Sequence, residues 1–485
     1  MDFERCAELH NKLAQIGWEA AGYEEPLPAT TWWDVYGNDQ KAADIAKRSP
    51  TFAKFLKLAI VIPFDYGTRN HREHHLFYLV CGLMSPKGMR EPSYINVDGL
   101  GLQHDNPRFI TIYATTIHND DLYEGVLYDL HSNDAIYVTD VQERHIAFNG
   151  RQLWYPLEDM LSNWHTMIEN GQIVAISDEA DSPPDIPAGL VNTDHEWTVD
   201  YNRHRPWVML PYSKGLLEMC LTSWEQLVQA IEDRIDLSTT QGAQYGIYDE
   251  ATLNSAEIPP GFARDFLSQA RKPKVEYLAP GMRLVSAGDF IKQPFSQDAK
   301  KFSHDRGSSG TDLWPIPLLQ ASELALPGSP VGSWTPLWQF SKSTYAAGLY
   351  FDGYRWGAQP LETVCRLVLP FGIGSKGNMR LTDGSVSGEK IGNKDPPMKF
   401  EDRHADLYQP GFNPFGDWQH VSLHSILQSW VSLVEKGEWK VSKQGVAESI
   451  SKWKDADSRN KWHLYRIELD QTGRTSHFVE TEREL

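Results

Sequence analysis

The chain has 485 residues and a formal net charge of −19, with 41% hydrophobic and 23% charged residues. A chain of this length and balance is expected to fold into two or three packed units, and wholesale disorder is excluded. The negative charge disfavours membrane or nucleic-acid binding through the overall field, although a local basic patch still permits it.

The four cysteines lie far apart without a C-x-x-C pair, which argues against a disulfide framework and a structural zinc site. The N-terminal sequence has no signal-peptide-like apolar run, and no stretch of ~18 consecutive apolar residues is present. We therefore expect a cytoplasmic protein without a membrane span, a metal or a cofactor. Its seventeen tryptophans are expected to pack helices onto sheets.

In chain order, residues 1–60 predict helices, with a break at Pro26 and Pro28. Short β-branched or aromatic runs bounded by turn residues follow, and they predict a mostly antiparallel sheet. The predicted strands are residues 55–64, 75–84, 108–117, 125–130, 135–140 and 144–150, with two more at 346–352 and 364–371. The fold class expected is therefore α+β.

One amphipathic helix motif, centred on a tryptophan, recurs near residues 157–173, 217–231 and 423–439. Apolar residues fall at i, i+3, i+4 and i+7 in each copy, which predicts one buried stripe. Pro156 suits the first helical position of the first copy. Gly171 and Gly437 suit the left-handed stop after a helix. Two good copies and one partial copy predict two related sheet-plus-helix halves.

Two Pro-rich segments, 177–189 and 324–334, are candidate linkers. They divide the chain into an N-terminal unit, a middle segment carrying a helix and a basic patch, and a C-terminal unit. The predicted boundaries are 1–176, 190–323 and 335–485.

An acidic segment at a predicted strand end groups His118, Asp120, Asp121 and Glu124. Carboxylates grouped in this way can clamp a guanidinium group through charge-assisted hydrogen bonds or supply an acid and a base. This is the candidate guanidinium pocket. An acidic turn without a ligand is the simpler alternative.

Basic residues occur in two further segments, a stretch at 264–306 and a loop that follows Gly372, Gly374 and Gly377. The glycines match G-x-G-x-x-G, but later Gly and Pro residues prevent the helix that a dinucleotide site needs. Aromatic residues interleave with the basic stretch, as in proteins that hold single-stranded nucleic acid. The candidate tRNA-binding residues are Arg271, Lys272, Lys274, Lys300, Lys301, Lys376 and Arg380.

Metal motifs are weak. His71, His74 and His75 match neither order of the zinc-peptidase motif. His404 and Asp406 form a His-x-Asp triplet that, with His463, resembles an iron facial triad. The triplet lies in a predicted loop, and chance explains it as well. No nucleophile motif is present, so the catalytic residues stay unassigned.

In its length, acidity and tryptophan content the chain resembles the arginine-containing cyclodipeptide synthases of fungal specialised metabolism. The resemblance also rests on two sequence segments, RPWVMLPYSKGLLEMCLTSWEQLVQAIEDR (205–234) and LWYPLEDMLSNWHTMIENGQI (153–173). The resemblance implies an enzyme that joins arginine from arginyl-tRNA to a second aminoacyl group as a diketopiperazine. It implies no particular catalytic residue.

A different class is also open. The order of short strands, IYVTD and an apolar helix ending in Glu-x-Gly is similar to the superfamily of fungal cell-wall-synthesis regulators and bacterial toxin-immunity proteins. That resemblance implies a protein-interaction module without catalysis, although the superfamily's Trp and Gly-Asp core motif is missing. Another cofactor-independent tailoring enzyme is a third alternative.

Overall fold

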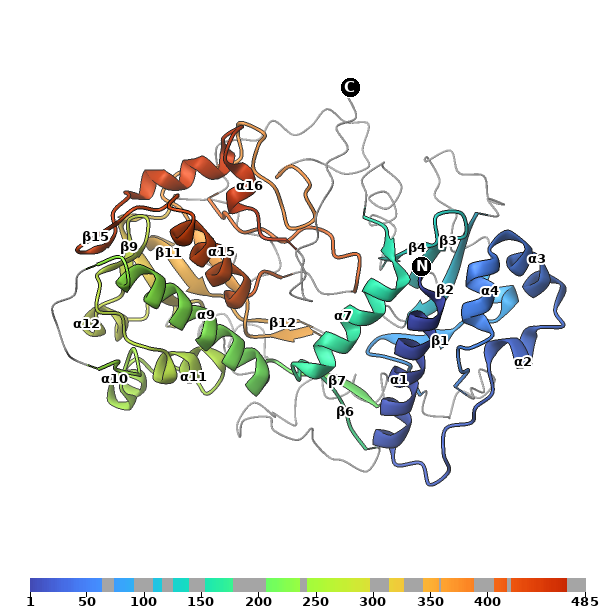
Figure 1. The fold of residues 1–485 in the computed structure, drawn as a ribbon. Helices are drawn as coiled ribbons and strands as arrows, with labels where there is room; N and C mark the ends of the chain where they lie inside the picture. The colour runs from blue at the N-terminus through green and yellow to red at the C-terminus, as the bar shows by residue number, and fades with distance from the viewer. Residues whose placement is uncertain are drawn as a thin grey trace.

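The computed structural model confirms the α+β class, with mostly antiparallel sheets and packed helices. Figure 1 shows two lobes, the N-terminal one in blue to teal and the other in green to red. The structure describes residues 1–62, 74–90, 108–115, 125–138, 153–177, 206–235, 242–296, 314–326, 343–356, 359–387, 405–416 and 420–468.

The N-terminal unit has a five-stranded antiparallel sheet in the order β1-β2-β3-β4-β5. Its strands are β1 (Val80–Leu83), β2 (Phe109–Thr115), β3 (Gly125–Asp129), β4 (Asp134–Val138) and β5 (Tyr155–Pro156). Its helices are α1 (Phe3–Ala21), α2 (Trp32–Tyr36), α3 (Gln40–Arg48), α4 (Pro50–Leu56), α5 (Pro86–Met89) and α7 (Leu157–Glu169). A separate ribbon pairs β6 (Ile173–Ala175) with β7 (Trp207–Met209).

The C-terminal unit has a seven-stranded sheet in the order β14-β11-β10-β9-β8-β16-β15. Its strands are β8 (Tyr277–Ala279), β9 (Met282–Leu284), β10 (Ile316–Leu324), β11 (Ala346–Phe351), β14 (Cys365–Val368), β15 (Val441–Ser442) and β16 (Gly445–Val446), while β12 (Tyr354–Trp356) and β13 (Gln359–Leu361) form a ribbon. Its helices are α9 (Lys214–Glu232), α10 (Glu250–Ser255), α11 (Phe262–Gln269), α12 (Ala287–Phe290), α15 (Leu423–Glu435), η3 (Ile450–Asp457) and α16 (Trp462–Tyr465).

The division into three units is not what the sheets show. β10 precedes the candidate linker at 324–334 and β11 follows it, yet the two strands pair in one sheet. Buried residues from Tyr212 to Ile467 form one core, and the other large core belongs to the N-terminal unit. The middle and C-terminal segments therefore share a core, because β10 requires β11 and β9 as neighbours.

The predicted strand at 55–64 is a further correction. Ser49 caps a helix by accepting a hydrogen bond from the Phe52 amide, and Pro50 occupies the first helical turn. These signals place Phe55 and Leu56 in α4. The apolar run is buried, and its length alone does not separate a strand from a short buried helix.

The Trp-centred helices are confirmed as α7, α9 and α15. Trp164, Trp224 and Trp430 are fully buried in them with most of the predicted stripe, while Leu221 of α9 and Ile168 of α7 are partly buried. Gly171 and Gly437 have φ angles of 73° and 71°, which is the predicted left-handed stop. Pro156 is the residue before the first turn of α7, one position earlier than predicted. Common ancestry of the two halves stays a prediction.

Candidate functional site

Strand β14 carries the charged residue around which the candidate site is built. Its register places Arg366 opposite Tyr350 of β11. On the other edge, the Leu407 amide donates to Leu367 O and the Cys365 amide donates to Val421 O. The two chain segments around Asp406 and His420 therefore run beside β14, on the edge opposite β11.

Arg366 forms ion pairs with two carboxylates. Its Nη1 lies 3.2 Å from Asp406 Oδ2, and its Nε lies 3.5 Å from Asp352 Oδ2. Arg366 is 3% exposed, and both aspartates are fully buried. Burying these three charged groups is costly unless they stay paired with one another.

The pKa values of these groups show what burial does. Burial raises the pKa of Asp406, while the Arg366 guanidinium and the Tyr408 amide oppose the rise. Burial and then Arg366 lower the pKa of His420 to about 4. Burial, assisted by Asp406 and Asp352, raises the pKa of the Tyr345 phenol. His420 is therefore neutral at pH 7, and burial makes Asp406 easier to protonate than an ordinary aspartate.

Four buried side-chain atoms of this group fall outside normal hydrogen-bond geometry: Arg366 Nε and Asp352 Oδ2, which form the 3.5 Å ion pair, and the two atoms described next. Asp406 Oδ1 and His420 Nδ1 are buried and make no hydrogen bond of normal geometry to the described residues. Buried polar atoms are usually paired, so such atoms indicate a ligand or a functional role. The arrangement can accept hydrogen bonds from a cationic N–H group and can take one proton. We name Asp352, Arg366, Asp406 and His420 the buried charge cluster.

The buried charge cluster lies near the junction of the two units. After Asp406 the chain crosses to the N-terminal unit, where Tyr137 N donates to Pro414 O at 2.9 Å. Trp164 Nε1 donates to Phe415 O at 2.8 Å. The chain then returns to β14 at His420. Ligand sites occur preferentially at such junctions, and Figure 1 shows α7 lying between the two lobes.

Sequence analysis missed this cluster, because its members are spread over nearly 70 residues. The available signal is a single arginine inside the apolar run CRLVLP (365–370). The predicted guanidinium pocket of His118, Asp120, Asp121 and Glu124 lies outside the described residues, as do Lys300, Lys301 and His404.

Most of the arginines and one lysine of the predicted basic stretch are paired with neighbouring carboxylates. Arg271 is 7% exposed and binds Glu225 at 2.7 Å and also Glu232. Its guanidinium therefore holds α9 against the following loop and is not presented to tRNA. Ion pairs also neutralise Arg264 with Glu250, Arg283 with Glu276 and Lys292 with Asp289. Lys272 and Lys274 have exposed side chains.

The Gly-rich loop already holds an internal anion. The Asp457 carboxylate accepts hydrogen bonds from the amides of Gly374, Lys376, Asn378 and Met379 at 2.8–3.1 Å. A loop whose amides are occupied in this way cannot cradle a phosphate through them. Lys376 is exposed, whereas Arg380 lies over the Trp462 ring.

Asp406 and His463, the two described residues of the predicted iron triad, have other surroundings. Asp406 pairs with buried Arg366, and His463 is exposed beside Trp462 on α16. Within the described ranges no three His, Cys, Asp or Glu side chains are placed to hold a metal ion. The four cysteines are buried free thiols, and no helix in the described part of the chain is long and apolar enough to span a membrane.

A serine–histidine pair also suggests catalysis at first sight. Ser223 Oγ lies 2.7 Å from His424 Nδ1, and this contact links α9 to α15. Ser223 is 1% exposed, and the same Nδ1 lies 3.3 Å from Met219 O. The pair lies between two packed helices and shares its ring nitrogen with a backbone carbonyl, so it stabilises helix packing.

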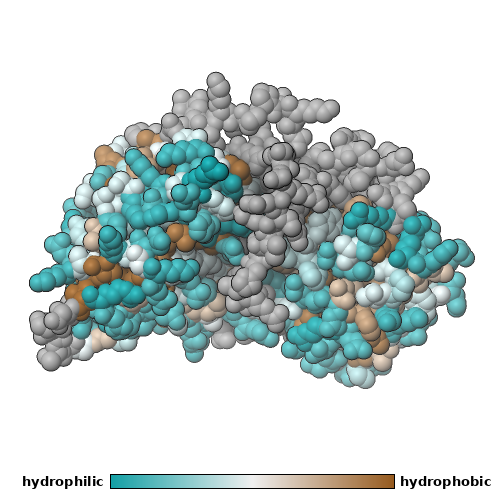
Figure 2. Space-filling model, turned by 45° about the horizontal axis from the view of Figure 1, so that its top comes forward, coloured by the Kyte–Doolittle hydropathy of each residue, from teal (hydrophilic) through white to brown (hydrophobic). Residues whose placement is uncertain are grey.

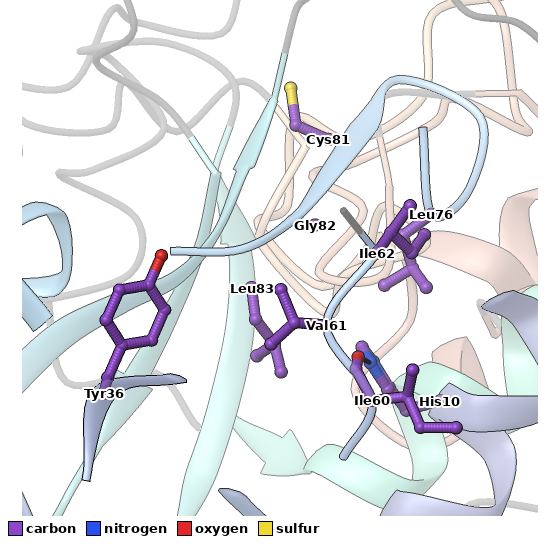
Figure 3. A pocket seen from close by; sticks show the side chains of 9 residues that line it. All are labelled: His10, Tyr36, Ile60, Val61, Ile62, Leu76, Cys81, Gly82 and Leu83. Carbon is purple, nitrogen blue, oxygen red and sulfur yellow. Dashed lines mark hydrogen bonds between the residues drawn. The ribbon is translucent and has the colours of Figure 1, made fainter. Parts of the chain in front are cut away.

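A small pocket in the N-terminal unit is the last candidate. It has a volume of about 60 Å³ and is lined by His10, Tyr36, Ile60, Val61, Ile62, Leu76, Cys81, Gly82 and Leu83 (Figure 3). His10 Nε2 must donate to Ile60 O, so its Nδ1 accepts from Tyr113. Burial lowers the His10 pKa to about 4. Ligand pockets usually measure about 300–1,000 Å³, so this one is too small for an aminoacyl substrate.

Comparison with known proteins adds no relative. No protein family model, no curated protein and no solved structure matches the chain significantly.

Proposed function

We propose that the protein is a cofactor-independent enzyme, a tRNA-dependent synthase that joins arginine to a second aminoacyl group as a cyclic dipeptide. The buried charge cluster carries the proposal, because it combines a buried, ion-paired carboxylate with an open carboxylate oxygen at Asp406. The resemblance of the chain to arginine-containing cyclodipeptide synthases supplies the substrates.

The reaction requires the protein mainly to position the two aminoacyl groups and to transfer protons. The aminoacyl ester is already activated, so the α-amine of one residue attacks the ester carbonyl of the other. A C–N bond forms, the C–O bond to the first tRNA ribose breaks, and the ribose oxygen leaves with a proton, which gives a dipeptidyl-tRNA. The free α-amine of that dipeptide then attacks its own ester carbonyl in the same way, which closes the ring and releases the second tRNA with a proton. Holding the two groups in place contributes most, and a positioned base contributes about 10²–10⁴-fold.

Asp406 is suited to take the ammonium proton. Its raised pKa brings the carboxylate closer to neutral pH than an ordinary aspartate, and Oδ1 is free to accept. Asp352 keeps Arg366 paired while Asp406 exchanges its proton. His420, being neutral, accepts a hydrogen bond from a substrate N–H through Nδ1.

The test is turnover of radiolabelled arginyl-tRNA together with a second aminoacyl-tRNA, followed by mass spectrometry of small products. The wild type is expected to release an arginine-containing diketopiperazine. Asp406→Asn removes the proton acceptor while keeping its shape, and the rate is expected to fall by about 10²-fold or more. The matched control is Asp455→Asn, because Asp455 is a partly exposed residue paired with Lys452 and Lys461.

A folded wild-type protein that leaves arginyl-tRNA unconsumed contradicts the proposal and favours the non-catalytic interaction module. Equal activity of the wild type and Asp406→Asn removes the cluster from the mechanism.

A further inference from the structure

A second basic region, which sequence analysis passed over, lies on α3 and α4. Residues 40–58 contain four lysines and Arg48 against the single acidic residue Asp44, a net charge of +4 in a chain of −19. The four lysines are exposed. We name Lys41, Lys47, Lys54 and Lys57 the lysine surface. Figure 2 shows a mostly hydrophilic right-hand edge, the side on which α3 and α4 lie in Figure 1.

The nearby acidic side chains are engaged elsewhere. Asp34 caps α2 and Asp39 caps α3 through their carboxylates. Asp44 pairs with Arg48 at 3.1 Å and with Arg90. Among the described residues no carboxylate forms an ion pair with any member of the lysine surface. Its charges are therefore available, unlike those of the ion-paired Arg264, Arg271, Arg283 and Lys292.

Two of these lysines lie against aromatic rings. Lys57 Nζ is 5.0 Å from the centre of the Trp33 ring, and Lys54 Nζ is 4.9 Å from that of Phe3. Both rings are partly exposed. Exposed cations beside aromatic faces are the combination that holds single-stranded nucleic acid, since phosphates bind the cations and bases stack on rings. An acidic peptide would use the charges but has no need of the rings.

We propose that the lysine surface binds the phosphate backbone of an RNA substrate. The proposal rests on the proposed function, which requires the protein to hold a tRNA despite its negative charge. Each lysine that contacts a phosphate releases a counterion, so binding through this surface weakens steeply with salt.

The experiment measures the Kd of fluorescently labelled, deacylated tRNA by anisotropy at several salt concentrations. In the test variant all four residues of the lysine surface are changed to Gln. The control variant changes Lys436, Lys440, Lys443 and Lys454 to Gln, because these four are also exposed but lie in the C-terminal unit, and Lys454 likewise lies over an aromatic ring, that of Phe371. We expect the test variant to bind at least about tenfold more weakly, with a log Kd–log salt slope lower by roughly 3.

The control variant is expected to bind tRNA like the wild type. Equal weakening by both variants, or an unchanged Kd and slope in the test variant, overturns the inference. Polyglutamate that binds the lysine surface when tRNA does not also overturns it.

Turnover of arginyl-tRNA in the same preparations separates the two proposals. If the wild type turns over arginyl-tRNA but the test variant keeps its tRNA affinity, the inference fails and the function stands. If the wild type binds tRNA through the lysine surface without turnover, the inference stands and the proposed function fails.

Discussion

Two buried aspartates in the C-terminal unit have opposite surroundings. Asp457 is 4% exposed and accepts four backbone amides of the Gly-rich loop. Asp406 is fully buried and accepts from one Arg366 nitrogen, with Oδ1 left open. Burial alone therefore does not identify a functional carboxylate. The difference lies in whether the fold has already used the oxygen atoms.

This contrast also separates structural from exchangeable charge. A carboxylate saturated by amides holds a loop in place and has no capacity for a ligand. A carboxylate that shares one guanidinium with a second acid keeps capacity for a ligand, and burial raises its pKa. Three substitutions test this contrast.

The largest effect is expected from Arg366→Leu. The change leaves Asp352 and Asp406 buried without their cation, and breaking a buried pair in this way costs about 3–5 kcal/mol. The midpoint of denaturant unfolding measures the loss. Arg283→Leu is the control, since Arg283 pairs with Glu276 at the surface and both side chains are at least 40% exposed. A loss no larger than that of the control would mean that the cluster is not held by charge.

A smaller loss, about 3 kcal/mol, is expected from Asp457→Ala, because several charge-assisted hydrogen bonds to backbone amides disappear together. Asp455→Ala, two residues earlier, removes only partly exposed ion pairs and is expected to cost less than about 1 kcal/mol. Hydrogen exchange of the 374–379 amides measures the local effect. Unchanged protection of those amides would contradict the role assigned to Asp457.

The smallest effect is expected from Asp406→Asn, and it appears in the pH dependence. A raised folded pKa means that the folded protein binds the proton more readily than the unfolded chain. Wild-type stability therefore falls as pH rises from the ordinary carboxyl value of about 3.9 to the raised folded value, and no further above it. Asn removes this decline.

The midpoints of denaturant unfolding between pH 4 and pH 7 measure this decline of stability in the wild type and in Asp406→Asn, with Asp455→Asn as the control. Parallel pH profiles for the wild type and Asp406→Asn would show that Asp406 does not exchange its proton in this range.

Local sequence patterns were sufficient to predict the Trp-centred helices. The i, i+3, i+4, i+7 stripes around Trp164 and Trp430 and the glycines after them predicted α7 and α15, because a helix buries one face by its own periodicity. The prediction of a strand at 55–64 was wrong. Apolar content alone allowed a strand there, but Ser49 and Pro50 start a helix that includes Phe55 and Leu56. Pairing of β10 with β11 across a Pro-rich segment could not be predicted from composition.

By itself, therefore, the sequence determined the fold class, the Trp-centred helices and the absence of a recognised catalytic motif. Only the tertiary structure decided which charges are used. It placed four backbone amides on Asp457, neutralised Arg271 with two glutamates, and left the lysine surface unpaired. It also brought Asp352, Arg366, Asp406 and His420 to one strand. The reason is physical: the availability of a charge depends on its neighbours in space, and sheet pairing makes neighbours of residues far apart in the chain.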